Sequence, residues 1–348
     1  MRRRCLIAEF TAQSGVLLTW PHACSDWQDD IDAVTAVYVE IAREITRREP
    51  LVVICYDSSH QRQVEHTLAT AGICGDALHF FQAPTNDTWI RDYGPIAVST
   101  GAERTLLDFS FNGWGNKHPA ELDNAISTAL NAAGLFAGTD FQHQSLVLEG
   151  GSIDTDGQGT LLTTAHCLIH SGRNPGHDKH SLEQLFHELM GIERVLWLDH
   201  GELEGDDTDA HIDMLARFCS PQTIAYLQCT DHDDTHYPPL AAMEIQLQSF
   251  RRADGEPYRL VPLPLPRPVC GATGQRLPAS YSNFLVINAA LLVPVYNDPA
   301  DAVALERLAA GFPDREIIPI NCLALIQQYG SLHCATMQLP EGFLSLSQ

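Results

Sequence analysis

A cysteine, two histidines and several carboxylates stand in short polar motifs along this chain, and together they could act on a cationic carbon centre. Cys334 follows His333, just after the Gly330-Ser331 turn, so a thiol at the mouth of a strand could face a substrate while its backbone stays fixed. The thiolate is the reactive form, and neighbouring charges and imidazoles set its population. Taken alone, Cys334 would be interpreted as a small buried hydrophobe, so the upstream motifs carry the argument.

Those upstream motifs stand just before, or at the start of, predicted strand hairpins. They are Trp89-Ile90-Arg91-Asp92, Leu148-Glu149-Gly150-Gly151, Asp206-Asp207-Thr208-Asp209-Ala210-His211-Ile212-Asp213 and Tyr281-Ser282-Asn283.

Carboxylates around an electrophilic carbon favour a planar cation that donates hydrogen bonds, and a guanidinium group fits that description. Two carboxylates can hold its nitrogens through paired, charge-assisted hydrogen bonds. A thiolate would then attack the central carbon, an imidazole would give a proton to the departing ammonia, and water would hydrolyse the covalent intermediate. This chemistry requires no metal or cofactor, because the charge already sits on the substrate.

Each motif also has a structural interpretation. Asp92 beside Arg91 could form a structural ion pair, and Glu149 before two glycines could cap a turn. His211 and Asp213 flank Ile212, so on a strand they would point to the same face, which suits either a shared site or a solvated edge.

Two acidic stretches resemble metal sites only superficially. Residues 154–157 (Asp-Thr-Asp-Gly) lack the remaining ligand spacing of a calcium loop and are typical of an Asp-Gly hairpin turn. Residues 231–236 (Asp-His-Asp-Asp-Thr-His) could bind a metal, but their place between a strand and a helix favours a solvated loop.

The elements that must position these motifs recur as hairpin, helix and strand, about once every sixty residues. The first module has strands at 16–21, 51–56 and 78–81, with helices at 26–48 and around Val64 and Leu68. The later modules are predicted as follows: strands 96–99 and 105–111, helix 119–133 and strand 145–148; strands 152–154 and 160–164, helix 181–190 and strand 194–198; strands 211–218 and 223–229, helix 239–250 and strand 259–263; strands 284–288 and 291–296, helix 299–310 and strand 316–320.

Five such modules predict an α/β repeat architecture closed into a ring, with the final run through Cys334 pairing with the N-terminal strand. Equivalent points of a ring converge on its axis, which would bring the scattered motifs into one cavity. The Pro-rich stretch 261–268 more naturally stiffens a loop than separates domains. We therefore expect one domain over residues 1–348.

Composition limits the class of protein, the partners and the cellular compartment that we expect. The 348 residues are 45% hydrophobic and 19% charged, as in an ordered globular protein. A formal net charge of −23 argues against nucleic acid or an anionic membrane as a partner and is compatible with a small cationic substrate. The ten cysteines include no Cys-x-x-Cys, and neither a signal peptide nor a membrane span is expected. Reduced thiols in the cytoplasm fit best.

The ordered motifs resemble those of the agmatine deiminases and the related bacterial-type peptidylarginine deiminases. The resemblance runs from Trp20-Pro21 to Pro340. It rests on Trp89-x-Arg91-Asp92-x-Gly94-Pro95, Asn112-Gly113-Trp114-Gly115, Glu149-Gly150-Gly151, Arg173-Asn174-Pro175, Thr208-Asp209-Ala210-His211-Ile212-Asp213, Ser280-Tyr281-Ser282-Asn283-Phe284 and His333-Cys334-x-Thr336.

This resemblance implies a five-bladed, pseudo-symmetric α/β propeller and hydrolysis of agmatine to N-carbamoylputrescine and ammonia, a step of putrescine biosynthesis. It implies the following roles: Cys334 as the nucleophile, His211 as the general acid/base, Asp92 and Asp213 as guanidinium-binding carboxylates, Glu149 as the carboxylate that helps hold the guanidinium and orients the histidine, Trp89 as a pocket wall, and Asp207 as a further substrate-binding acid.

The chain departs from the family pattern at five positions, which are expected to reshape the pocket around the far end of the substrate. Tyr329 and Ser331 stand in a run that is commonly three glycines, Met337 replaces a Gln, Ala210 a Gly and Asp207 a Glu. Alternatives to agmatine deimination are therefore a peptidylarginine or other guanidine deiminase, an amidinotransferase, and a guanidine-binding protein with decayed catalysis. The oligomeric state stays open, with a homodimer possible.

Overall fold

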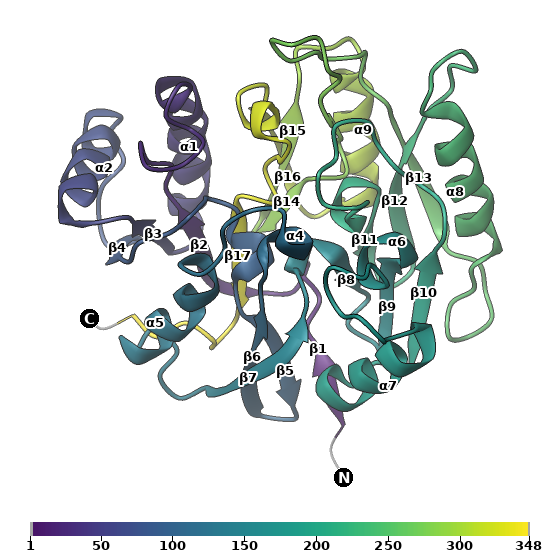
Figure 1. Ribbon diagram of the computed structural model, residues 1–348, viewed down its shortest axis with the longest axis horizontal. Coiled ribbons are helices and arrows are strands. Elements are labelled where there is room, and N and C mark those ends of the chain that lie inside the picture. The colour runs from purple at the N-terminus through teal and green to yellow at the C-terminus, as the bar shows by residue number, and fades with distance from the viewer. Residues whose placement is uncertain (1–2, 347–348) are drawn as a thin grey trace.

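The computed structural model describes residues 3–346 and shows a mixed α/β fold with five separate small sheets (Figure 1). Met1 and Arg2, where the basic start of the chain begins, lie outside the described residues. The six longer helices lie toward the periphery of the view in Figure 1, and the strands lie nearer its centre. Within residues 3–346, no helix combines the length and apolar character needed to cross a bilayer.

Three of the sheets have the same plan: an antiparallel hairpin, then a helix, then a third strand parallel to the second. The elements are β8 (Ile153–Thr155), β9 (Thr160–Thr164), α7 (Lys179–Met190) and β10 (Arg194–Leu198); β11 (Ala216–Ser220), β12 (Thr223–Gln228), α8 (Tyr237–Ser249) and β13 (Arg259–Pro264); β14 (Leu285–Ile287), β15 (Ala290–Val295), α9 (Asp301–Gly311) and β16 (Glu316–Asn321).

The other two sheets have four strands each, because strands from the chain ends join them. In one, β1 (Arg4–Leu6) pairs with β5 (Ile96–Thr100), followed by β6 (Glu103–Ser110) and β7 (Asp140–Val147). In the other, β17 (Thr336–Pro340) pairs antiparallel with β2 (Gln13–Thr19), followed by β3 (Leu51–Cys55) and β4 (Leu78–Gln82). The predicted pairing of the last strand with the N-terminal strand is confirmed.

Helices α1 (Ile31–Thr46) and α2 (Ser58–Thr70) show how the sequence fixes local structure. Val34, Ile41 and Ile45 of α1 are buried on one face, as their helical spacing requires. The Asp57 carboxylate accepts the Ser59 and His60 N–H groups and caps α2. These helices stand before β3 and β4, whose strand sequences are largely apolar.

Three sequence predictions need correction. The predicted helix at 119–133 is only η1 (Asp123–Ala125) and α5 (Ile126–Ala132), because the Asp123 and Asn124 side chains are used to hold the backbone of other segments. The strand predicted at 145–148 spans 140–147 as β7, and β1 was not predicted.

The third correction concerns His211 and Asp213, which do not lie on a strand. Asp209 and Ala210 both have φ of 65°, so the chain turns sharply before His211. The 3-10 helix η3 (Ile212–Met214) follows, and β11 begins only at Ala216. The two-residue spacing therefore has a different geometric meaning from the one predicted, although both side chains still reach the same pocket.

Short helical turns in the connections carry most of the polar motifs. They are α3 (Ile90–Tyr93), α4 (Gly113–Asn116), η2 (Gly150–Ser152), α6 (Ala165–Leu168), η3 and η4 (Leu325–Gln328). Their positions between sheet strands let residues far apart in sequence meet at one place.

Candidate active site

A pocket of about 120 Å³ brings together most of the residues singled out from the sequence. Trp89, Asp92, Asp207, His211, Asp213 and Cys334 all line it. Glu149 is not among the lining residues, but it is fully buried close behind His211. The central geometric expectation, a thiol, an imidazole and carboxylates around one cavity, is met by the coordinates.

Cys334 lies two residues before β17, with its side chain buried against Asn283 and Asp213. Its Sγ atom is 3.2 Å from Asn283 Nδ2 and 3.6 Å from Asp213 Oδ2. Burial raises the pKa of the thiol well above its usual value, and the charges of Asp213 and Asp92 raise it further. A cation entering between these groups would oppose that shift and favour the thiolate.

Asp92 is held from two sides on α3. Its Oδ1 accepts the Gly151 N–H at 2.9 Å and its Oδ2 accepts the Trp114 indole N–H at 2.9 Å. Burial raises its pKa, while the nearby His211 opposes the shift. These two donors fix the carboxylate in place, and a side chain at Gly151 would collide with it, since a Cβ there would lie 2.8 Å from Asp92 Oδ1.

Asp213 differs from Asp92 because it has a histidine partner. Its Oδ2 is 2.8 Å from His333 Nδ1, while its Oδ1 is buried without a hydrogen-bond partner. Burial would raise the pKa of Asp213, but the hydrogen bond and charge of His333 outweigh it and hold the pKa below its usual value. Asp213 therefore offers one free acceptor oxygen in a charged form.

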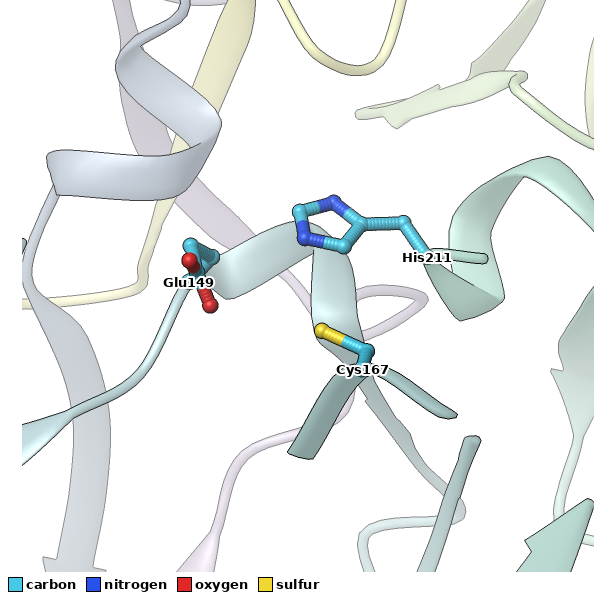
Figure 2. A group of neighbouring side chains, drawn as sticks. All are labelled: Glu149, Cys167 and His211. Carbon is cyan, nitrogen blue, oxygen red and sulfur yellow. The ribbon is translucent and has the colours of Figure 1, made fainter. Parts of the chain in front are cut away.

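Glu149, His211 and Cys167 form a buried group, shown in Figure 2, in which the His211 ring, the Glu149 carboxylate and the Cys167 sulfur face a common space. One oxygen of Glu149 accepts from Arg173 Nε at 2.7 Å, and the other has no partner. Both His211 ring nitrogens also lack hydrogen-bond partners, although Nδ1 is 3.7 Å from Asp92 Oδ1. His211 is thus placed among carboxylates with both nitrogens available for proton transfer.

The same three residues are the group within residues 3–346 whose ligand atoms approach closely enough to consider a metal ion, all within 4.8 Å of one another. Carboxylate, thiolate and imidazole are ligands that zinc accepts. However, the Arg173 guanidinium already binds Glu149 and would repel a cation there. No sequence motif indicates Cys167, so its closeness to His211 was not predicted.

The mouth of the pocket carries both signs of charge. The Asp207 side chain is 43% exposed and pairs with His118 at 2.8 Å and Lys117 at 3.5 Å. Asp87 has one oxygen bonded to the Thr88 N–H, and burial raises its pKa to about 6. Trp114, Thr208 and Gly330 stand in the sequence motifs without a predicted site role, and no sequence signal indicates the lining residues Asp26, Asp87, His118, Met214 and Gln328.

Of the five family departures, Asp207 and Tyr329 line the pocket. Ala210 and Tyr329 have φ of 65° and 66°, a left-handed conformation that favours glycine and costs other residues about 1 kcal/mol. Ser331, Met337 and Ala210 do not line the pocket. Gly330 is retained because a Cβ there would lie 2.5 Å from the Trp89 ring.

The structural alternatives raised from the sequence also have outcomes. Arg91 does not pair with Asp92 but with Glu9, at 3.1 Å. Asp156 accepts the Gln158 and Thr160 N–H groups in the turn between β8 and β9. In the 231–236 loop, Asp234 binds Arg276 and the His236 ring, so part of that loop is structural.

Comparison with known proteins gives the family. Residues 5–340 match the model of the Porphyromonas-type peptidyl-arginine deiminases, and the chain belongs to that family. A provisionally named agmatine deiminase of Vibrio parahaemolyticus is 32% identical over 96% of both chains.

Two solved structures are also similar. A provisionally named arginine deiminase of Porphyromonas gingivalis has 45% identity and a TM-score of 0.92, covering 99% of this chain and all of that one. A cysteine-to-serine variant of C. jejuni agmatine deiminase with substrate bound has 35% identity and a TM-score of 0.90, covering 98% and 97%.

Proposed function

We propose that this protein is a deiminase that hydrolyses the guanidinium group of agmatine to N-carbamoylputrescine and ammonia. The observation that carries the proposal is the pocket around Cys334. The Cys334 thiol lies there beside the carboxylate of Asp213, which has one oxygen without a partner, and Asp92 and His211 line the same pocket. The family and the similar agmatine deiminases support the same reaction.

The first half of the reaction forms a covalent intermediate. Asp92 and Asp213 hold the guanidinium, whose positive charge offsets the two carboxylates that raise the pKa of Cys334. The thiol proton passes to His211, and the thiolate attacks the guanidinium carbon. His211 then gives that proton to the leaving nitrogen, the C–N bond breaks, and ammonia departs from a thiouronium intermediate.

The second half of the reaction hydrolyses this intermediate, with His211 now acting as a base toward water. Water attacks the thiouronium carbon while His211 takes its proton, and the C–S bond then breaks to return the sulfur as thiolate and leave a urea group on the product. Glu149, buried beside His211 with one oxygen free, stabilises the imidazolium that forms in both halves. The net change consumes one water and releases one ammonia.

We also propose that the five sheets are the blades of a pseudo-symmetric propeller and that residues 1–348 form one catalytic domain. The repeated hairpin-helix-strand plan and the pairing of β17 with β2 support this arrangement. The ten cysteines are free, which fits a cytoplasmic protein. Its partner would be a small guanidino cation, with neither nucleic acid nor membrane required, and a homodimer is compatible with this function.

A second candidate is a deiminase of arginine or peptidyl-arginine. The specific observation in its favour is the mouth of the pocket, where Lys117 and His118 compensate Asp207 and would tolerate the carboxylate or peptide group of such a substrate. The 45% identity to the Porphyromonas gingivalis protein points the same way.

A substrate panel tests both candidates. Purified protein is incubated with agmatine, arginine and a peptide with an internal arginine, and ammonia and the ureido product are quantified together. Equal amounts of ammonia and N-carbamoylputrescine from agmatine support the main proposal, and preference for arginine or the peptide supports the second. Formation of a new guanidine from an added amine would instead indicate an amidinotransferase, and absence of product from all three would overturn deimination.

A further inference from the structure

A second cavity, of about 60 Å³, shares no lining residue with the pocket of Cys334. Glu9, from the loop between β1 and β2, lines it together with Arg91, Asp154 and Gln338. We call this the rear cavity. His333 links it to the pocket, because one ring nitrogen faces Asp213 and the other faces Glu9.

Glu9 contacts several of the charged and polar groups around the rear cavity. Its carboxylate accepts from His333 Nε2 at 3.0 Å, Arg91 Nη1 at 3.1 Å and Gln338 Nε2 at 3.0 Å, and it pairs with Arg217. Burial would raise the pKa of Glu9, but Arg217, His333 and Arg91 together hold it well below its usual value. Glu9 is therefore an ionised acceptor.

The His333 ring lies between two carboxylates, which fixes the hydrogen-bonding roles of its two nitrogens. Ionised carboxylates only accept hydrogen bonds, so a ring that bonds Glu9 and Asp213 at once must donate from both nitrogens. The main-chain N–H of His333 donates to Asn283 Oδ1 at 2.9 Å, which fixes the ring next to the amide that contacts Cys334.

We propose that Glu9 and His333 are positioning residues that act through Asp213: Glu9 holds the His333 ring as a hydrogen-bond donor to Asp213, and His333 holds one oxygen of Asp213 so that the other is turned to the substrate. This inference rests on the proposed deimination, since Asp213 matters there as a guanidinium ligand. Binding of Oδ2 by His333 leaves the unpartnered Oδ1 for the substrate cation. Neither residue touches the substrate in this arrangement.

The electrostatics give the arrangement a defined pH signature. The charged and titratable groups that influence Asp213 are His333, His211, Arg217, Arg91, Asp92 and Cys334. Because the pKa of Asp213 is lowered in the folded chain, Asp213 stays ionised as the pH falls toward its usual titration range. Without Glu9, His333 becomes a weaker hydrogen-bond donor, and the pKa of Asp213 rises. As the pH falls, Asp213 then loses its charge, and with it the binding of a cation, at a higher pH than in the wild type.

The test compares Glu9→Gln with Asp154→Asn. Asp154 lines the same rear cavity and binds Arg217 Nε at 3.0 Å, but it makes no hydrogen bond to His333. For Glu9→Gln we expect the acid limb of the pH profile to move up by about one unit, so that kcat/KM for agmatine falls about tenfold at acid pH. Glu9→Asp should restore much of the limb, whereas Asp154→Asn should lower Tm and leave the limb in place.

A second readout keeps this test separate from the choice of substrate. The rate at which 2-chloroacetamidine, a cationic amidine, alkylates Cys334 is measured across the same pH range in all four proteins. A wild type that is alkylated but converts no guanidine overturns deimination, and a shifted alkylation limb in Glu9→Gln still supports the positioning role. Identical limbs in wild type and Glu9→Gln, or an equal shift in Asp154→Asn, would overturn that role.

Discussion

The pocket of Cys334 and the rear cavity are both lined by buried charges, but they use them in opposite ways. Around the rear cavity, Glu9, Arg91, Arg217 and Asp154 hydrogen-bond to one another or to common partners. In the pocket group, Glu149, His211 and Asp213 keep buried polar atoms without hydrogen-bond partners. Buried polar groups normally find partners because unpaired ones cost free energy. The difference indicates that the charged groups of the rear cavity hold one another in place, whereas the candidate site keeps polar atoms free for a ligand.

Replacing the nucleophile should separate the two regions most sharply. In Cys334→Ser we expect deimination to fall by at least about a thousandfold, because a serine hydroxyl is a far weaker nucleophile here than a thiolate. Tm should change little, and agmatine should still bind, as measured by calorimetry. Cys322→Ser, another buried cysteine that lies outside the pocket, serves as the control and should retain turnover. Turnover of Cys334→Ser within tenfold of wild type would contradict the assignment.

A substitution among the charged residues around the rear cavity should mainly lower the stability of the fold. Arg217→Met removes the buried cation that pairs with both Glu9 and Asp154, so we expect a loss of about 3–5 kcal/mol in the free energy of unfolding. Chemical denaturation measures it. Arg43→Met removes the more exposed pair with Glu40 and should cost about 1 kcal/mol or less. Equal losses in the two variants would mean that the rear charges are no more structural than surface ones.

Removing one pocket carboxylate should cost binding rather than folding. Asp92→Asn eliminates a charge-assisted contact with the guanidinium worth about 3 kcal/mol, so kcat/KM should fall about a hundredfold. The control is Asp108→Asn, a buried aspartate of β6 that binds Thr128 and His143 away from the pocket. If Asp108→Asn lowers kcat/KM as strongly as Asp92→Asn, the loss reflects general destabilisation.

The sequence predicts the repeated modules well because each depends on local patterns. Apolar spacing in α1 and the apolar run in β3 identify elements without knowledge of their neighbours. It fails where long-range contacts decide, as for the helix at 119–133, whose first residues bind other segments. His211 and Asp213 were paired for the wrong geometric reason, since the positive φ angles of Asp209 and Ala210 replace the expected strand with a turn.

The candidate site shows the same difference between residues that local sequence motifs indicate and residues that only long-range contacts bring together. The motifs indicate Cys334, Asp92, Asp213, His211 and Glu149, and the coordinates place them together, although their roles stay predictions. No sequence motif indicates Glu9, because nothing local links it to His333, which is 324 positions away. Nor does the sequence reveal the approach of Cys167 to His211, since it depends on a contact between residues far apart along the chain.

The smallest expected effect concerns which acid at the mouth receives the far ammonium group of agmatine. Burial raises the pKa of Asp87 to about 6, so its charge is lost as the pH falls through 6, and KM for agmatine should then rise in the wild type. Asp87→Asn should have a KM about fivefold higher at pH 8 and lack that rise. Asp207→Asn should change KM less, because Lys117 and His118 already compensate its carboxylate. A larger effect at Asp207 than at Asp87 would reassign the ammonium to Asp207, the acid that the family resemblance implies.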